Sequence, residues 1–198
     1  MKDWKALYER AWEIASRAHQ GQKDKGGHPY IGHPMAVADM VLKPEEKVVA
    51  LLHDVVEDTS VTLQELEKEF PEEVVKAVDL LTKKKGADFS MEKYLKDIRQ
   101  NEIARQVKLA DLKHNMDLSR ITNPTRKDLI RLERYKKSKD YLEGKKGMTD
   151  RTCFMYFSTK KKKLEKEMKK LKAKYEKGGA LTLKNVDADF KFTKPEME

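Results

Sequence analysis

A chain of 198 residues is long enough for one domain, or for one domain with a small appendage. Its hydrophobic residues, 38% of the total, fall in periodic stretches that argue against a disordered chain, although 39% of the residues are charged. No apolar run approaches the roughly 18 residues needed to cross a bilayer. The single cysteine, Cys153, excludes an internal disulfide framework and a multi-thiolate metal site.

The formal net charge of +9 is concentrated late in the chain, where residues 159–177 contain ten lysines and three glutamates, a net charge of +7. Such a run is usually a solvated helix face, an interpretation we favour over contact with RNA or another anionic partner. The first residues have the pattern of an amphipathic helix and lack the apolar core of a signal peptide. We therefore expect a cytoplasmic protein without a membrane partner, and the sequence indicates no oligomeric state.

Hydrophobic periodicity predicts helices over most of the first 145 residues. In chain order, we expect helices near residues 4–18, 35–42, 44–58, 63–70, 71–82, 90–99 and 102–119, and a last one from Asn123-Pro124 to about Tyr141. A loop rich in glycine and lysine, residues 21–34, separates the first two. Thr62 and Glu65 form a capping-box pattern, and Ser90 can cap the helix that follows it.

The pattern changes after Gly144. Residues 152–158 and 181–192 are strand-like, and the lysine-rich stretch between them has a helical apolar stripe. We therefore expect an all-α helical bundle, residues 1–145, followed by a small lysine-rich α/β extension of strand–helix–strand order, residues 146–198.

The segment VVALLHDVVEDT places four ligand-type side chains on one face if it forms a continuous helix. His53 stacks on Glu57, and Asp54 stacks on Asp58, each at i, i+4 spacing. Three carboxylates beside one imidazole repel one another unless a cation or solvent compensates them. A helix whose polar face simply meets water explains this segment equally well.

Two further segments carry side chains of the same kind. His33 lies at the mouth of the glycine-rich loop, directly before Pro34. Lys108, Asp111 and Asn115 share one helix face at i, i+3, i+7 spacing, in an otherwise apolar stretch. An aspartate there should not be buried unpaired, so either a metal or a basic neighbour, Lys108 or Arg105, is expected beside it.

Three segments, AHQGQKDKGGHPYIGHPMAVA, LLHDVVEDT and VKLADLKHNMD, in this order and spacing resemble the hydrolase domain of the Rel/Spo alarmone enzymes and the small stand-alone alarmone hydrolases. These are HD metal-dependent phosphohydrolases. The resemblance covers residues 7–142 and implies an HD-domain helical bundle.

Residue by residue, the resemblance implies a metal held by His33, His53, Asp54 and Asp111. The metal is usually Mn²⁺ in this family, and the ligand types alone also admit Fe²⁺, Co²⁺, Ni²⁺ or Zn²⁺. Glu57 and Asp58 match the pair that positions and activates the attacking water. Asn115 matches a contact to the nucleotide sugar, and Lys25 matches a cation that meets phosphate. We expect His114, near Asp111, to be structural or adjacent to a ligand, and His19 to be packed.

The function implied is 3′-pyrophosphohydrolysis of guanosine 3′,5′-bis(diphosphate), ppGpp, with release of pyrophosphate. Two positions depart from the family pattern: Asp24 stands where an arginine is typical, and Leu118 where a short polar residue is common. Asp24 should repel phosphate, so an HD phosphohydrolase acting on a different nucleotide is one alternative. A non-catalytic HD module that binds nucleotide or RNA is the other.

Overall fold

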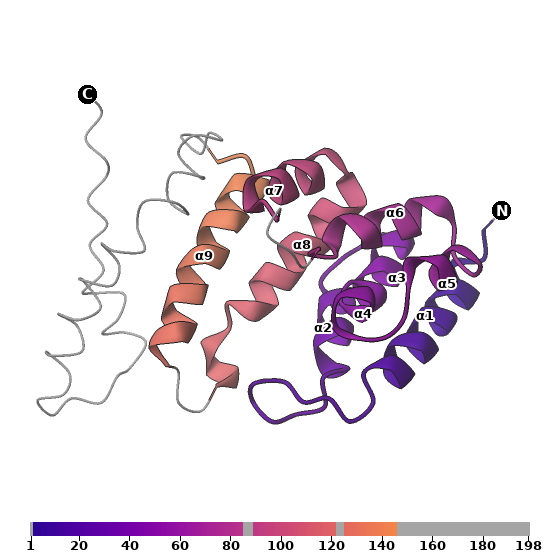
Figure 1. Ribbon diagram of the computed structural model, residues 1–198, viewed down its shortest axis with the longest axis horizontal. Coiled ribbons are helices and arrows are strands. Elements are labelled where there is room, and N and C mark those ends of the chain that lie inside the picture. The colour runs from indigo at the N-terminus through magenta and orange to yellow at the C-terminus, as the bar shows by residue number, and fades with distance from the viewer. Residues whose placement is uncertain (1, 85–88, 122–124, 146–198) are drawn as a thin grey trace, which may run out of the picture. The chain divides into compact units, whose positions relative to one another are not determined.

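The computed structural model describes residues 2–84, 89–121 and 125–145, which form a bundle of helices (Figure 1). The α-helices are, in chain order, α1 (Trp4–Ala18), α2 (Gly32–Asp39), α3 (Pro44–Leu52), α4 (Val55–Asp58), α5 (Leu63–Glu67), α6 (Glu72–Leu81), α7 (Met91–Gln100), α8 (Glu102–Asn115) and α9 (Arg126–Leu142). A turn of 3-10 helix, η1 (Leu118–Arg120), follows α8. The described residues contain no strand, only an isolated antiparallel bridge between Lys23 and Pro29. The all-α prediction is confirmed for these residues, whereas the predicted extension, residues 146–198, lies outside them.

Helix α3 is the centre of the bundle. It packs against α1, α2, α6 and α8. All five residues from Val48 to Leu52 are completely buried, so the last turn of α3 is apolar around its whole circumference. Each large side chain buried there contributes about 1.5–3 kcal/mol of transfer free energy. Because His53 and Asp54 follow Leu52 directly, the most buried helix fixes where this motif lies.

The prediction of one helix over residues 44–58 is wrong, because the helix is interrupted at His53 and Asp54. At the break, the His53 side chain bonds the backbone of the preceding turn. Its Nδ1 donates to the carbonyl of Ala50 (2.7 Å), the acceptor that the Asp54 amide would use in a continued α-helix. Other boundaries also differ: the helix expected at 35–42 spans Gly32–Asp39, the one expected at 63–70 ends at Glu67, and the one expected at 102–119 ends at Asn115.

The capping predictions for Thr62, Glu65 and Ser90 are confirmed. Thr62 and Glu65 form the reciprocal capping box, and the Ser90 hydroxyl accepts from the amide of Lys93. The final helix, α9, has Thr125 as its N-terminal cap. Asn123 and Pro124, which we expected to open this helix, lie outside the described residues.

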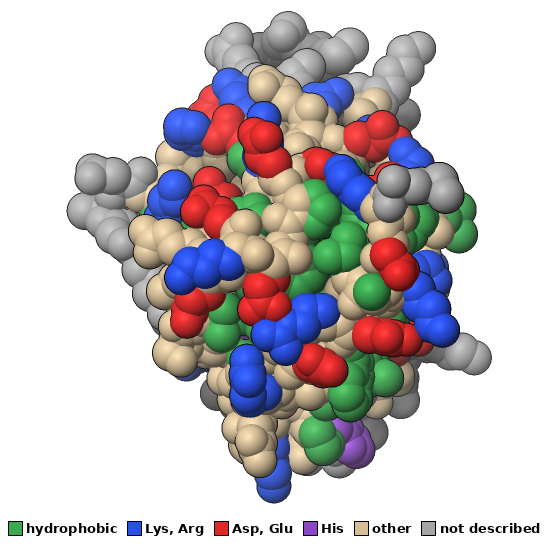
Figure 2. All heavy atoms as spheres, turned by 90° about the vertical axis from the view of Figure 1, so that its right-hand side faces the viewer, with side chains coloured by type: hydrophobic (Ala, Val, Ile, Leu, Met, Phe, Trp, Pro, Cys, Tyr) green, Lys and Arg blue, Asp and Glu red, His purple; other side chains and the backbone are tan. Residues whose placement is uncertain are grey.

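The high charge content appears as a surface of mixed sign. Figure 2 shows acidic and basic side chains interspersed around small hydrophobic areas on the face that lies to the right in Figure 1. Ion pairs such as Arg10–Glu69 and Lys2–Glu73 join exposed parts of the first half of the chain. Exposed pairs of this kind contribute about 0–1 kcal/mol each. Within the described residues, no helix combines the length and the apolarity that crossing a membrane requires.

The helix that carries Asp111 depends on an N-terminal cap. The side chain of Asn101 accepts a hydrogen bond from the Ala104 amide at 2.9 Å. We expect Asn101→Ala to lower the free energy of unfolding by about 1 kcal/mol, because it leaves that amide without its partner. Asn101→Asp, which keeps the acceptor, should retain most of the stability. Urea denaturation followed by circular dichroism measures both; equal losses in the two variants would exclude the cap as the cause.

Candidate metal centre and adjoining pocket

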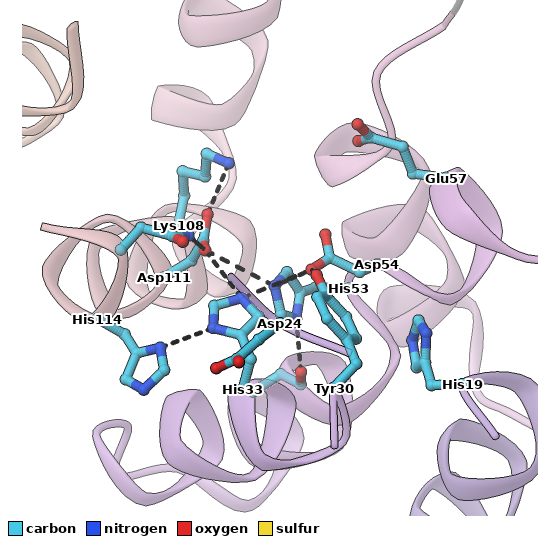
Figure 3. A network of polar contacts seen from close by, with 12 residues as sticks. His19, Asp24, Tyr30, His33, His53, Asp54, Glu57, Lys108, Asp111 and His114 are labelled. Atoms are coloured by element: carbon cyan, nitrogen blue, oxygen red, sulfur yellow. Dashed lines mark hydrogen bonds and ion pairs between the residues drawn. The ribbon is translucent and has the colours of Figure 1, made fainter. Parts of the chain in front are cut away.

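Helices α2, α3 and α8 pack together and bring His33, His53, Asp54 and Asp111 close to one another. These four residues are called the histidine–aspartate cluster. His33 lies in the first turn of α2, His53 and Asp54 form the turn after α3, and Asp111 lies near the C-terminal end of α8. Helices α2 and α8 both pack against α3 and against each other. Figure 3 shows the four side chains directed toward a common centre.

In this cluster, two imidazole nitrogens face the same pair of carboxylates. The Nε2 atom of His33 lies 3.2 Å from Oδ1 of Asp111 and 3.5 Å from Oδ2 of Asp54. The Nε2 atom of His53 lies 3.0 Å from Oδ2 of Asp54 and 3.8 Å from Oδ1 of Asp111. Both histidines and Asp111 are buried, and Asp54 is only slightly exposed. The arrangement therefore concentrates two negative charges where little water can reach them.

This donor set fits a divalent cation. The buried Nε2 atom of His53 has no hydrogen-bond partner of good geometry. Among the described residues, His33, His53 and Asp54 each offer one ligand atom, and these atoms lie within 4.8 Å of one another. Asp111 is not in this tightest group, but its Oδ1 faces both histidines. Imidazole and carboxylate ligands suit several first-row divalent ions and do not single out one.

The pKa values in the cluster reflect how close its carboxylates and imidazoles lie to one another. Although burial alone favours a neutral imidazole, the carboxylates of Asp54 and Asp111 raise the pKa of His53 to about 10. The pKa of His33 is raised in the same way against the effect of burial. Burial works against ionisation of Asp54 and Asp111, yet nearby cations hold the pKa of both carboxyls well below the usual range. Positive charge between these carboxylates is thus strongly favoured.

Neighbouring groups also donate hydrogen bonds to both carboxylates. Lys108 donates to Oδ2 of Asp111 at 2.7 Å, and Asn115 donates to Oδ1. The alternative pairing of Asp111 with Lys108 is therefore realised on one oxygen, while the other oxygen faces the histidines. The Tyr30 hydroxyl donates to Oδ2 of Asp54 at 2.5 Å, and burial together with this carboxylate raises the pKa of Tyr30.

The Nδ1 atoms of His33 and His53 also have hydrogen-bond partners. His53 uses the Ala50 carbonyl, as described above. His33 places its Nδ1 2.7 Å from Nδ1 of His114, which lies 2.8 Å from a guanidinium nitrogen of Arg120. Burial, and then the neighbouring His33 and Arg120, lower the pKa of His114 to about 4. His114 thus lies next to a candidate ligand, as one of the two predictions for it stated.

Glu57 and Asp58, the predicted water-positioning pair, occupy different surroundings. The Glu57 carboxylate accepts from the backbone amide (3.0 Å) and the ammonium group (3.1 Å) of Lys83. In Figure 3 it lies apart from the four clustered side chains. Asp58 is exposed, and partial shielding together with the charges of Asp54 and Glu57 raises its pKa. The charge of Asp54, one member of the cluster, therefore acts on Asp58.

A cavity of about 230 Å³ adjoins the cluster and shares His33 and Tyr30 with it. Its charged lining residues are the cations Lys23, Lys25, Arg120 and Arg131 and the acids Asp24, Asp117 and Asp128. Asn115 and the buried side chain of Leu118 also line it. Small-molecule sites usually measure about 300–1,000 Å³, so this cavity is large enough for part of such a ligand.

Lys25 and Asp24, the two residues of the glycine-rich loop discussed in the sequence analysis, both form ion pairs. The Lys25 ammonium pairs with Asp128, and this contact and the Thr125 hydroxyl lower the pKa of Asp128. Asp24 accepts from the guanidinium of Arg120 at 2.5 Å and from the amides of Gly26 and His28. The negative charge of Asp24 is therefore compensated inside the protein, and the expected repulsion of phosphate is weakened.

Sequence reasoning did not identify Arg120 and Lys83 as site residues. Arg120 is 96 positions from Asp24, and Lys83 belongs to a run of lysines with the appearance of a solvated loop. Nothing in the local pattern distinguishes these basic residues from other surface cations. His19 is buried, as predicted; its Nδ1 also lies 2.9 Å from the side-chain oxygen of Gln22, and its ring lies 4.8 Å from that of Tyr30.

A helical bundle that gathers histidines and aspartates around a candidate metal site is the arrangement of HD hydrolases, which use divalent metals. The HD domain family matches residues 11–127, which is more than half of the chain. The chain therefore belongs to the HD domain family, and the resemblance found in its sequence is confirmed.

Curated relatives give the same assignment. A GTP pyrophosphokinase of Streptomyces coelicolor is 36% identical over 146 residues, which cover 68% of this chain and 16% of that protein. The GTP pyrophosphokinase rsh of Brucella melitensis is 39% identical over 124 residues, covering 56% of this chain and 16% of that protein. This chain thus spans about a sixth of the length of these relatives.

A solved structure shares the fold. It belongs to a metazoan ortholog of SpoT that hydrolyses ppGpp and plays a role in starvation responses. The two structures superpose with a TM-score of 0.61 at 23% sequence identity, over 79% of this chain and 96% of the other.

The raised pKa values predict how a divalent ion binds. Near neutral pH the two imidazoles hold protons that a metal must displace, so binding should release protons. We expect the Kd for Mn²⁺ to fall as the pH rises from about 6.5 to about 8.5, with a binding enthalpy that depends on the buffer. Isothermal titration calorimetry in two buffers measures both. His53→Ala should abolish tight binding, and the exposed His28→Ala serves as the control; a pH-independent affinity would contradict this protonation state.

Proposed function

We propose that this chain is a divalent-metal-dependent nucleotide phosphohydrolase, and that its substrate is ppGpp, from which it releases pyrophosphate at the 3′ position. The observation that carries this proposal is the buried cluster of His33, His53, Asp54 and Asp111, which opens beside a cavity lined by several cations. The cavity has four cations against three acids, so it offers a small excess of positive charge to a polyphosphate beside the cluster.

In this proposal His33, His53, Asp54 and Asp111 hold the metal, for which Mn²⁺ is our first choice. When bound, such an ion supplies Lewis-acid chemistry to a phosphoryl group and to water. The chain's own residues prepare the site for it. Lys108 holds Oδ2 of Asp111, so Oδ1 stays directed toward the histidines, and Tyr30 donates to Oδ2 of Asp54, the oxygen that also faces both histidines.

Asp58 is the candidate that takes the proton of the attacking water. Its raised pKa brings it closer to the working pH, as general-base catalysis requires. Glu57 completes the proposed pair. Because Lys83 holds both oxygens of Glu57, this carboxylate is fixed in direction and is suited to orienting the water.

For the nucleotide, we assign phosphate contact to Lys25 and sugar contact to Asn115. Both residues line the cavity, and Asn115 also reaches Asp111, so it connects the cavity to the cluster. An ammonium such as that of Lys25 makes a charge-assisted hydrogen bond with phosphate. Lys25 would then exchange its contact with Asp128 for one with the substrate.

The relatives support a guanosine nucleotide as substrate. The Streptomyces coelicolor relative is named a GTP pyrophosphokinase, and the metazoan ortholog of SpoT hydrolyses ppGpp. Hydrolysis is the reaction that a histidine–carboxylate metal site suits, since such a site can activate water.

A substrate panel with Mn²⁺ tests the activity. We expect ppGpp to be turned over with release of pyrophosphate, and Asp58→Asn and Glu57→Gln to lower kcat by about 10²- to 10⁴-fold while Mn²⁺ remains bound. Glu67→Gln, at an exposed position of α5, is the matched control and should keep full activity.

The outcomes separate the alternatives. Orthophosphate as the sole product, or turnover of a different nucleotide only, would assign another HD phosphohydrolase activity. No turnover with any divalent metal, together with salt-sensitive RNA binding, would indicate a non-catalytic module. Loss of Mn²⁺ in Glu57→Gln would show that this carboxylate is a ligand instead.

A further inference from the structure

A continuous chain of polar contacts joins the cavity loop to one candidate metal ligand. It runs from Asp24 through Arg120 and His114 to His33, with distances of 2.5, 2.8 and 2.7 Å. Figure 3 shows His114 on the side of His33 that faces away from Asp54. The chain thus reaches His33 at Nδ1, opposite the nitrogen that faces the carboxylates.

The chemistry of arginine fixes where the protons lie. A guanidinium is always charged and can only donate, so the Nδ1 of His114 that meets Arg120 must offer its lone pair. The Nδ1 of His33 lies 2.7 Å from the same atom, so it must carry a proton there and share the single lone pair of His114 Nδ1 with Arg120. The Nε2 of His33 faces Asp111 and Asp54 on the other side of the ring, and it presents a lone pair there once a metal has displaced its proton.

The two candidate ligand histidines are therefore oriented in different ways. His53 is fixed by a backbone carbonyl, that of Ala50, which no side-chain substitution removes. His33 depends on side chains alone, and the last of them, Asp24, belongs to the loop that lines the cavity. Hydrogen bonds behind a metal-binding histidine commonly change metal affinity by about 10- to 100-fold.

The loop and the 3-10 turn that carries Arg120 fit together closely. A Cβ atom added at Gly26 would lie 2.7 Å from the backbone carbonyl oxygen of Arg120, so only glycine permits this approach. Asp24 accepts from the amides of Gly26 and His28 through one oxygen and from Arg120 through the other. The loop is thus built to hold the Arg120 guanidinium against His114.

We propose that Arg120 is a positioning residue: held by Asp24 and acting through His114, it sets the ligand nitrogen of His33. The inference rests on the metal-binding role proposed above for His33. It also explains how the chain accommodates an aspartate where related enzymes typically carry an arginine, since Asp24 anchors an arginine that comes from a distant segment.

Mn²⁺ affinity of the full-length protein at one pH, measured by competition with a chelating indicator, tests the proposal. We expect Arg120→Gln to weaken binding about 10-fold or more, and Asp24→Asn to weaken it in the same direction. The control is Arg131→Gln, which removes an arginine from the same cavity without touching His114, and should leave Mn²⁺ affinity unchanged. Unchanged affinity in Arg120→Gln would overturn the proposal.

A double-mutant cycle shows whether Arg120 acts through His114. In a His114→Phe background, Arg120→Gln should cause no further loss of Mn²⁺ affinity, because the intermediate group is gone. Full additivity of the two losses would overturn the proposed route.

A second readout needs no metal. In protein labelled with ¹⁵N-histidine, we expect Nδ1 of His114 to resonate as an unprotonated nitrogen, and to shift in Arg120→Gln and not in Arg131→Gln. A protonated Nδ1 on His114 in the unsubstituted protein would overturn the proposal. Absence of Mn²⁺ binding by that protein would instead refute the proposed function, and the nitrogen spectra would still decide the proton arrangement.

Discussion

Two carboxylates shielded from water, Asp111 fully and Asp54 for the most part, face the same pair of imidazole nitrogens, and this proximity of like charges is the constraint on which the site depends. Burying an ionised carboxylate costs several kcal/mol unless other groups compensate it. Lys108 compensates one oxygen of Asp111, and the Tyr30 hydroxyl binds one oxygen of Asp54. The inner side of the cluster still requires positive charge, which protons on the histidines or a divalent cation can supply.

The fold produces this crowding through one apolar helix. The last turn of α3 is completely buried, so the His53-Asp54 turn that follows it must lie inside the bundle too. Helices α2 and α8 pack on the same helix and deliver His33 and Asp111 from opposite ends of the domain sequence. The contacts behind the ligands then differ in kind: a backbone carbonyl orients His53, and a series of side chains orients His33.

Much of the fold could be predicted because it follows from local patterns. Apolar periodicity placed the helices, and the Thr62–Glu65 capping box is present as expected. The break at His53 could not be predicted, since the side chains of VVALLHDVVEDT are spaced as in a continuous helix. The pairing of Asp24 with Arg120 could not be predicted either, because it joins two charged residues far apart in the sequence. For the same reason, the contact between Lys83 and Glu57 appears only in three dimensions.

The most direct measurement is the position of the metal in crystals grown with Mn²⁺, located by anomalous scattering. A single strong peak should lie among the Nε2 atoms of His33 and His53 and the carboxylates of Asp54 and Asp111, about 2.0–2.4 Å from each ligand atom. A peak elsewhere in the molecule, or an ordered cluster without any peak at saturating Mn²⁺, would contradict the assignment of these four residues as a metal centre.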